Sequence, residues 1–216
     1  MRLRNVLVGF ALLGWLGASA GCGDVIGIED ATCDPSLQEC QSGASPITGN
    51  DLCQQYCSTV MQNCTGSFQV YVGRETCLSV CKLLPEGQAG DENVNSVQCR
   101  LAQAKLAGEI PEPAIHCSAA GPGGNSLCGD NCESICTITQ GACTGEHQQF
   151  QSVADCSEDC SSVPTAKAAD GNEYYDVVAK EMSSGNSRQC RLWHASVATQ
   201  SPNPHCAHAG GASPCR

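Results

Sequence analysis

Apolar residues along the chain fall into two patterns. One is an uninterrupted stretch from Val6 to Leu16, near the N-terminus. The other consists of short segments in which apolar residues and cysteines recur three or four positions apart, the spacing of one face of an α-helix. The second pattern fills most of the chain and predicts an all-α fold.

The helical segments form two sets of three. The expected helices span residues 51–64, 68 or 70 to 84, and about 93–108, and residues 132–143, 148–163 and about 174–199. At 100° per residue, Cys53, Cys57 and Cys64 share one helix face. Pro85 is expected to end the second helix, because the residue before a proline disfavours helical backbone. The Pro- and Gly-rich segments after each third helix are expected to be loops.

The second set of helices repeats the first. Five cysteines in the first half are separated by gaps of 3, 6, 12 and 3 residues, and five in the second half have the same four gaps at an offset of 79 residues. Further on, a shared motif that contains Gln-Cys-Arg-Leu begins at Asn95 and again at Asn186. We therefore expect two copies of one unit, repeat 1 (49–128) and repeat 2 (129–216). Each copy has eight cysteines, an even number that can close four internal disulfides.

Paired Cys-x3-Cys motifs on neighbouring antiparallel helices predict a hairpin held by two disulfides. Antiparallel register joins Cys53 to Cys81 and Cys57 to Cys77, and by repetition Cys132 to Cys160 and Cys136 to Cys156. Spacing leaves the partners of the other cysteines open, namely Cys64, Cys99, Cys117, Cys128, Cys143, Cys190, Cys206 and Cys215.

The twin Cys-x3-Cys hairpin is similar to that of the small Tim chaperones of the mitochondrial intermembrane space. The inner gap of 19 residues between Cys57 and Cys77 and the four further cysteines in each repeat depart from that family. The resemblance therefore implies a common hairpin geometry and no function. Beyond this likeness, the duplicated Cys-rich domain is expected to match no characterised family.

Residues 1–21 form an expected export signal. Arg2 and Arg4 precede the apolar stretch, which has 11 residues and is too short to span a bilayer as a helix. The small residues that follow lead to Cys22, and this arrangement resembles a bacterial lipoprotein signal, which implies that Cys22 is lipidated and becomes the N-terminus. Ser19 stands where that motif usually has leucine. The alternative is ordinary cleavage after Ala20.

Residues 22–48 are expected to form a tether that contains one short loop closed by Cys33 and Cys40. With sixteen cysteines in the repeats and this pair, Cys22 is the one cysteine of the 19 left over. Lipidation of Cys22 would account for it, and the membrane is then a partner through the lipid. We expect a protein of the cell envelope, anchored to the outer membrane, or otherwise periplasmic or secreted.

Composition narrows the class of protein further. The chain of 216 residues has 11 Lys and Arg against 22 Asp and Glu, and loss of the two leader arginines would bring the net charge from -11 to -13. An acidic chain of this kind lacks the basic surface that nucleic acids require. Aromatic residues make up 4% of the chain, so the core is thin and disulfides are expected to stabilise the fold.

Three histidines of repeat 2 offer the best candidate for a metal site. His205 and His208 flank Cys206, and His194 follows Cys190 by four residues. If the two cysteines lie close together, the three imidazoles can converge on Zn²⁺ or Cu²⁺. Repeat 1 keeps only one of the three. The alternative is that these are ordinary loop histidines.

Other chemistry finds little support in the sequence. Acidic groups at 91–93 and 170–173 lack the alternation of a Ca²⁺ loop, and no serine-nucleophile or phosphate-loop motif occurs. We therefore expect a non-catalytic binding or scaffolding protein of the envelope, with no cofactor and with an unidentified envelope protein as a possible partner. The alternative function is metal binding, or a metal-dependent activity, at His194, His205 and His208.

Overall fold

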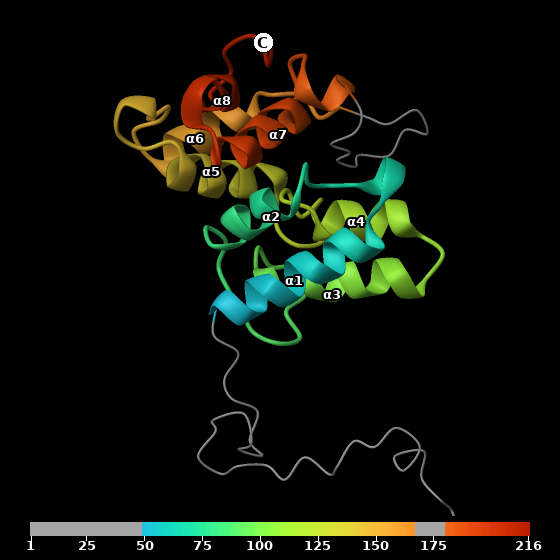
Figure 1. Cartoon of the computed structure of the whole chain (residues 1–216). Helices are drawn as coiled ribbons and strands as arrows, with labels where there is room; N and C mark the ends of the chain where they lie inside the picture. The colour runs from blue at the N-terminus through green and yellow to red at the C-terminus, as the bar shows by residue number, and fades with distance from the viewer. Residues whose placement is uncertain (1–48, 167–179) are drawn as a thin grey trace, which may run out of the picture. The chain divides into compact units, whose positions relative to one another are not determined.

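The computed structural model describes residues 49–166 and 180–216, and these are all-α, as predicted (Figure 1). Repeat 1 contains α1 (Gly49–Asn63), α2 (Arg74–Cys81), α3 (Val97–Glu109) and α4 (Pro113–Ala120). Repeat 2 contains α5 (Asn131–Ala142), α6 (Val153–Ser161), α7 (Arg188–Ala198) and α8 (Pro202–Ala209). Short 3₁₀ helices are η3 (Gly66–Phe68), η4 (Gly145–His147) and η5 (Lys180–Ser183).

Each repeat begins with a helical hairpin held by two disulfides. In repeat 1, Cys53 is bonded to Cys81 and Cys57 to Cys77, with Cα–Cα distances of 5.7 and 5.8 Å. In repeat 2 the corresponding bridges have Cα–Cα distances of 5.6 and 5.7 Å, and they join Cys132 to Cys160 and Cys136 to Cys156. These are the four pairs that antiparallel register predicts.

The remaining bridges connect each hairpin to the second half of its repeat. Cys64, just after α1, is bonded to Cys117 of α4, and Cys99 of α3 is bonded to Cys128. Repeat 2 has the same arrangement, with bridges Cys143–Cys206 and Cys190–Cys215. Each of these eight bridges in the described residues lies within one repeat. The four bridges of repeat 1 join the same relative positions as the four of repeat 2, so both copies have the same internal connectivity.

The segments after the third helices are not loops throughout, which corrects the expectation from their Pro and Gly content. Each contains a further helix, α4 or α8, and each of these helices has a proline in its first turn. A proline there fits well, because the amide that it lacks has no acceptor within the first turn of a helix. The third helices pack closely against these additional helices.

The second and third helices are shorter than the sequence pattern indicates. Gly66 has a left-handed φ of 61°, and the chain is extended at Gly73, so α2 begins at Arg74 rather than near residue 70. In repeat 2, the side chain of Ser187 accepts a hydrogen bond from the Cys190 amide and caps α7, which therefore begins at Arg188. Residues 174–179 of the expected third helix lie outside the described part of the chain.

Both repeats contribute to one core, which consists largely of cystines and small aliphatic side chains. Tyr56 and Tyr71 are the two fully buried aromatic rings of the described residues, and their hydroxyl oxygens are 2.8 Å apart. Burial raises the pKa of Tyr56 to about 12. Across the boundary between the repeats, Gly123 leaves room for the side chain of Leu192.

Arg100 of α3 is completely buried at this boundary. Its guanidinium donates hydrogen bonds to the carbonyl oxygens of Ser96, Gly121 and Pro122 and to Ser134 Oγ of repeat 2, at 2.9 to 3.1 Å. Carbonyl dipoles and a hydroxyl therefore solvate this charge. Arg191, at the matching position of repeat 2, instead forms an ion pair with Asp159.

Candidate metal centre

The three histidines singled out from the sequence meet at one point in repeat 2. His194 lies in the middle of α7, while His205 and His208 lie on α8, three residues apart and therefore on one face. The Cys143–Cys206 bridge holds α8 between these two histidines, and the Cys190–Cys215 bridge lies one helical turn before His194. Two disulfides thus fix the elements that carry the imidazoles.

The ring nitrogens converge through their Nδ1 atoms. His194 Nδ1 is 2.7 Å from His205 Nδ1 and 3.4 Å from His208 Nδ1. One ligand atom from each histidine lies within 4.8 Å of the other two. Two nitrogens bound to the same tetrahedral Zn²⁺ are about 3.3 Å apart, given Zn–N bonds near 2.0 Å. The three side chains therefore need only small adjustments to bind one ion.

The second ring nitrogen of His194 determines the proton arrangement. Its Nε2 is 3.1 Å from the carbonyl oxygen of Ser183, which can only accept, so Nε2 carries a proton. Burial lowers the pKa of His194 to about 4, so the ring is neutral at pH 7. Its unprotonated Nδ1 then accepts a hydrogen bond from His205 Nδ1, and a metal ion would take the place of the proton between them. A ring N–H donated to a backbone carbonyl is the usual outer contact of a metal-binding histidine.

The cluster is buried on one side and partly open on the other. His194 is 4% exposed, whereas His205 and His208 are half-buried and reach solvent. Burial also lowers the pKa of His205, and the neighbouring His208 lowers it further. Trp193 packs edge-on against His194, with ring centroids 4.6 Å apart, and forms the apolar wall of the cluster.

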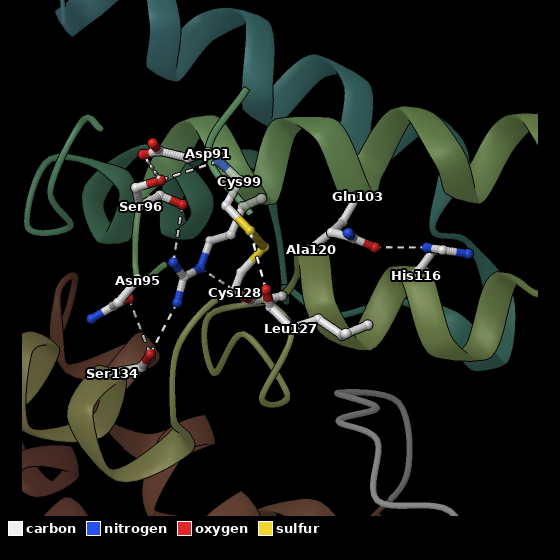
Figure 2. Close-up of a disulfide and its surroundings, with 12 residues drawn as sticks. Asp91, Asn95, Ser96, Cys99, Gln103, His116, Ala120, Leu127, Cys128 and Ser134 are labelled. Carbon is white, nitrogen blue, oxygen red and sulfur yellow. Dashed lines mark hydrogen bonds between the residues drawn. A yellow bond between two sulfur atoms is a disulfide. The ribbon is translucent and has the colours of Figure 1, made fainter. Parts of the chain in front are cut away.

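Repeat 1 shows what the same position looks like without the extra imidazoles (Figure 2). Gln103 occupies the place of His194, and its Oε1 is 2.7 Å from His116 Nδ1, the counterpart of His205. The counterpart of His208 is Ala119, which is fully buried. One copy of the unit thus has an amide–imidazole hydrogen bond where the other has three imidazoles.

The sequence did not reveal two groups that shape the cluster. The Ser183 carbonyl comes from η5, outside any motif, and no side-chain pattern can signal a backbone acceptor. Trp193 could have been noticed, since it directly precedes His194 in the sequence.

Several other predicted features lie elsewhere or outside the described residues. Cys22 and the pair Cys33 and Cys40 are outside them, as is the acidic group at 170–173. Asp91, from the other acidic group, accepts hydrogen bonds from the Gln88 amide and the Ser96 hydroxyl through Oδ2. It therefore orders the loop before α3.

The fold and this cluster define a class: a disulfide-rich, all-α protein built from a duplicated helical unit, with a histidine cluster in the second copy. A family model described as BfoA family C-terminal domain matches the chain twice, over residues 32–132 and 130–214. The chain belongs to this family, and the two matches correspond to the duplicated region. The expectation that the Cys-rich domain matches no characterised family is therefore wrong. No curated protein and no solved structure shows significant similarity to the chain.

The disulfides also indicate where the protein is found. Eight bridges in the described residues require an oxidising environment, which points to an extracytoplasmic compartment. Within residues 49–166 and 180–216, no helix has the length and apolar character needed to cross a bilayer.

Proposed function

We propose that this protein is an exported cell-envelope protein with a non-catalytic role, in which repeat 2 binds one divalent transition-metal ion through His194, His205 and His208. The convergence of three Nδ1 atoms, with His194 held in the tautomer whose Nδ1 is unprotonated, is the observation that carries the proposal. If the ion does not bind, the remaining proposal is that the protein acts as a scaffold without a metal.

The donor set favours Zn²⁺ or Cu²⁺ over harder ions. Neutral imidazole nitrogen suits these two metals, whereas Ca²⁺ and Mg²⁺ require oxygen ligands. Three protein nitrogens leave at least one coordination position for water or for a donor from another molecule. Because His205 and His208 reach solvent, the ion can enter without unfolding of the core.

Metal titration of the purified, disulfide-intact protein tests this proposal. Calorimetry with Zn²⁺ should give one ion per chain. Cu²⁺ should also quench the fluorescence of Trp193, which lies beside His194 and is the only tryptophan outside the predicted leader. His194→Gln installs the residue found in repeat 1 and should abolish both signals.

The matched control is His116→Ala in repeat 1, which removes the corresponding imidazole where no cluster exists. This variant should keep the full stoichiometry and quenching. Unchanged binding in His194→Gln and in His208→Ala, or equal losses in the repeat 1 control, would eliminate the site.

We further propose that Cys22 is lipidated and anchors the protein to the outer membrane. The support is the resemblance of residues 1–22 to a lipoprotein signal and the single cysteine left without an assigned partner. Growth of the producing bacterium with labelled palmitate should label the protein, and Cys22→Ser should remove the label and release the protein from membranes. Label retained in that variant would contradict the anchor.

A further inference from the structure

We propose that the Cys190–Cys215 disulfide is a redox-controlled pair of ligands for the same metal centre. On reduction, the two thiolates join His194 and change the site from three nitrogens to a mixed sulfur–nitrogen set that binds Zn²⁺ more tightly. This inference rests on the proposed metal-binding function and specifies how the site is regulated.

The geometry of the sulfur atoms carries the inference. Cys190 Sγ, Cys215 Sγ and a ring nitrogen of His194 all lie within 4.8 Å of one another. Cys190 precedes His194 by one turn of α7, so both side chains project from the same helix face. His194 therefore belongs to two possible ligand groups, one with the two sulfurs and one with the two other imidazoles, so reduction offers an ion at His194 two thiolates in place of the two imidazoles.

The chemistry is a thiol–disulfide exchange with a dithiol reductant, followed by metal binding. The reductant's thiolate attacks one sulfur of the bridge, its second thiol resolves the mixed disulfide, and the reductant leaves as its own disulfide. Two electrons thus pass to Cys190 and Cys215, which become thiols. Each thiol loses its proton to solvent when its sulfur binds the ion, because the thiolate is the metal ligand.

The chain around Cys215 gives a reductant a route to this buried bridge. Cys215 lies outside the helices, between the half-buried Pro214 and the exposed Arg216. The Cys215 amide donates a hydrogen bond to the Ala212 carbonyl and the Ala212 amide to the Ala207 carbonyl, and both contacts are local. A hydrogen bond of 2.7 Å from the Gly185 amide to the Pro214 carbonyl ties this segment to the chain before α7. Breaking that contact and lifting the short segment after α8 exposes the sulfurs while the helices stay packed. Local openings of this kind cost less than unfolding.

Repeat 1 contains the natural control for this inference. Its Cys99–Cys128 bridge has the same position, the same burial and the same Cα–Cα distance of 5.6 Å. Gln103 stands where His194 would, and its amide is a poor ligand for Zn²⁺ (Figure 2). Any metal effect on reduction should therefore appear at one bridge and be absent at the other.

The experiment measures reduction of each bridge with and without metal. The full protein is equilibrated in a thiol–disulfide redox buffer of fixed composition, with Zn²⁺ or with a chelator, and free thiols are alkylated and mapped by mass spectrometry. Zn²⁺ should raise the ratio of dithiol to disulfide at Cys190 and Cys215 by at least about tenfold. Reduction of Cys99–Cys128 should not change.

Co²⁺ supplies a direct test of sulfur ligation. The partly reduced protein should show a sulfur-to-cobalt charge-transfer band that the oxidised protein lacks. The band should disappear in Cys190→Ser/Cys215→Ser and persist in Cys99→Ser/Cys128→Ser. Absence of the band, its persistence without Cys190 and Cys215, or equal metal effects on both bridges would overturn the inference. Zn²⁺ binding by the oxidised protein is measured separately, so failure of the proposed function remains distinguishable.

Discussion

His194 combines a buried position with a titratable ring, and this combination makes stability depend on pH. Burial holds the pKa of His194 at about 4 in the folded protein, against 6.5 in an unfolded chain. Between these values the unfolded chain binds a proton that the folded protein does not. Stability is therefore lost as pH falls from about 6.5 towards 4, and it is fully retained above that window.

We predict that metal-free protein with intact disulfides loses roughly 2–3 kcal/mol of unfolding free energy between pH 7.5 and 4.5 through this residue. Chemical denaturation at a series of pH values measures the loss. His194→Gln should flatten the profile by that amount, because glutamine does not titrate. Parallel profiles for the two proteins would show that the folded protein accepts the proton readily.

A second prediction at the level of a single side chain concerns Arg100. Its planar guanidinium meets three carbonyl oxygens and one hydroxyl from four different residues. The ammonium of lysine has three donors and cannot span that arrangement. Arg100→Lys should therefore leave buried acceptors unpaired and cost about 2–4 kcal/mol in denaturant unfolding.

The control for Arg100 is Arg74, an exposed residue whose guanidinium contacts Gln54 and Ser58 at the surface. Arg74→Lys should change the unfolding free energy by less than about 0.5 kcal/mol. Equal effects of the two substitutions would show that the Arg100 contacts do not contribute to stability.

At the level of helices and their connections, the sequence predicted what depends on local spacing. The Cys-x3-Cys motifs fix one helix face, so the hairpins and their bridges followed from the register alone. The pairing of Cys64 with Cys117 did not follow from the register, because it depends on how α4 folds back across α1. The Pro and Gly content of this segment indicates a loop, whereas Pro113 occupies the first turn of α4, where a proline is well tolerated.

The candidate site was predicted for a similar reason and with a similar limit. The positions of the histidines beside Cys190 and Cys206 let the sequence name all three, on the condition that these two cysteines lie close together. It could not supply the contact that orients His194, because the Ser183 carbonyl comes from a segment with no matching motif.

The turn at Gly124, in the connection between α4 and α5, leads to a prediction at the level of secondary structure. Gly124 has a left-handed φ of 75°, and a Cβ at this position would meet the carbonyl oxygen of Cys128, with Arg100 also close. Because the obstacle is backbone, it cannot move aside without breaking the turn that closes the Cys99–Cys128 bridge. Gly124→Ala should cost at least about 2 kcal/mol.

Thermal unfolding of Gly124→Ala measures this cost, and Gly73→Ala is its control. Gly73 has an extended backbone that any residue adopts, and a Cβ there meets no atom within 4 Å. This control should change stability by less than about 1 kcal/mol. A similar effect of both substitutions would mean that the turn at Gly124 rearranges freely.

At the scale of the whole molecule, the disulfides compensate for a core with few large side chains. Among residues 49–166 and 180–216, the two completely buried aromatic rings belong to repeat 1, and much of the remaining core is cystine, alanine and valine. The bridges join residues 20 to 63 positions apart, and each contributes roughly 3–4 kcal/mol by restricting the unfolded chain. A typical domain has only about 5–15 kcal/mol of net stability.

Complete reduction should therefore unfold the protein near room temperature. The helices of eight or nine residues, such as α2 and α6, are too short to persist alone in water, so their ellipticity should be lost along with the tertiary contacts. Far-UV circular dichroism before and after reduction and alkylation measures this, and oxidised protein exposed to the alkylating reagent alone is the control. If the reduced chain kept its helices and melted at the same temperature as the oxidised protein, the apolar contacts between the two repeats would have to stabilise the fold by themselves.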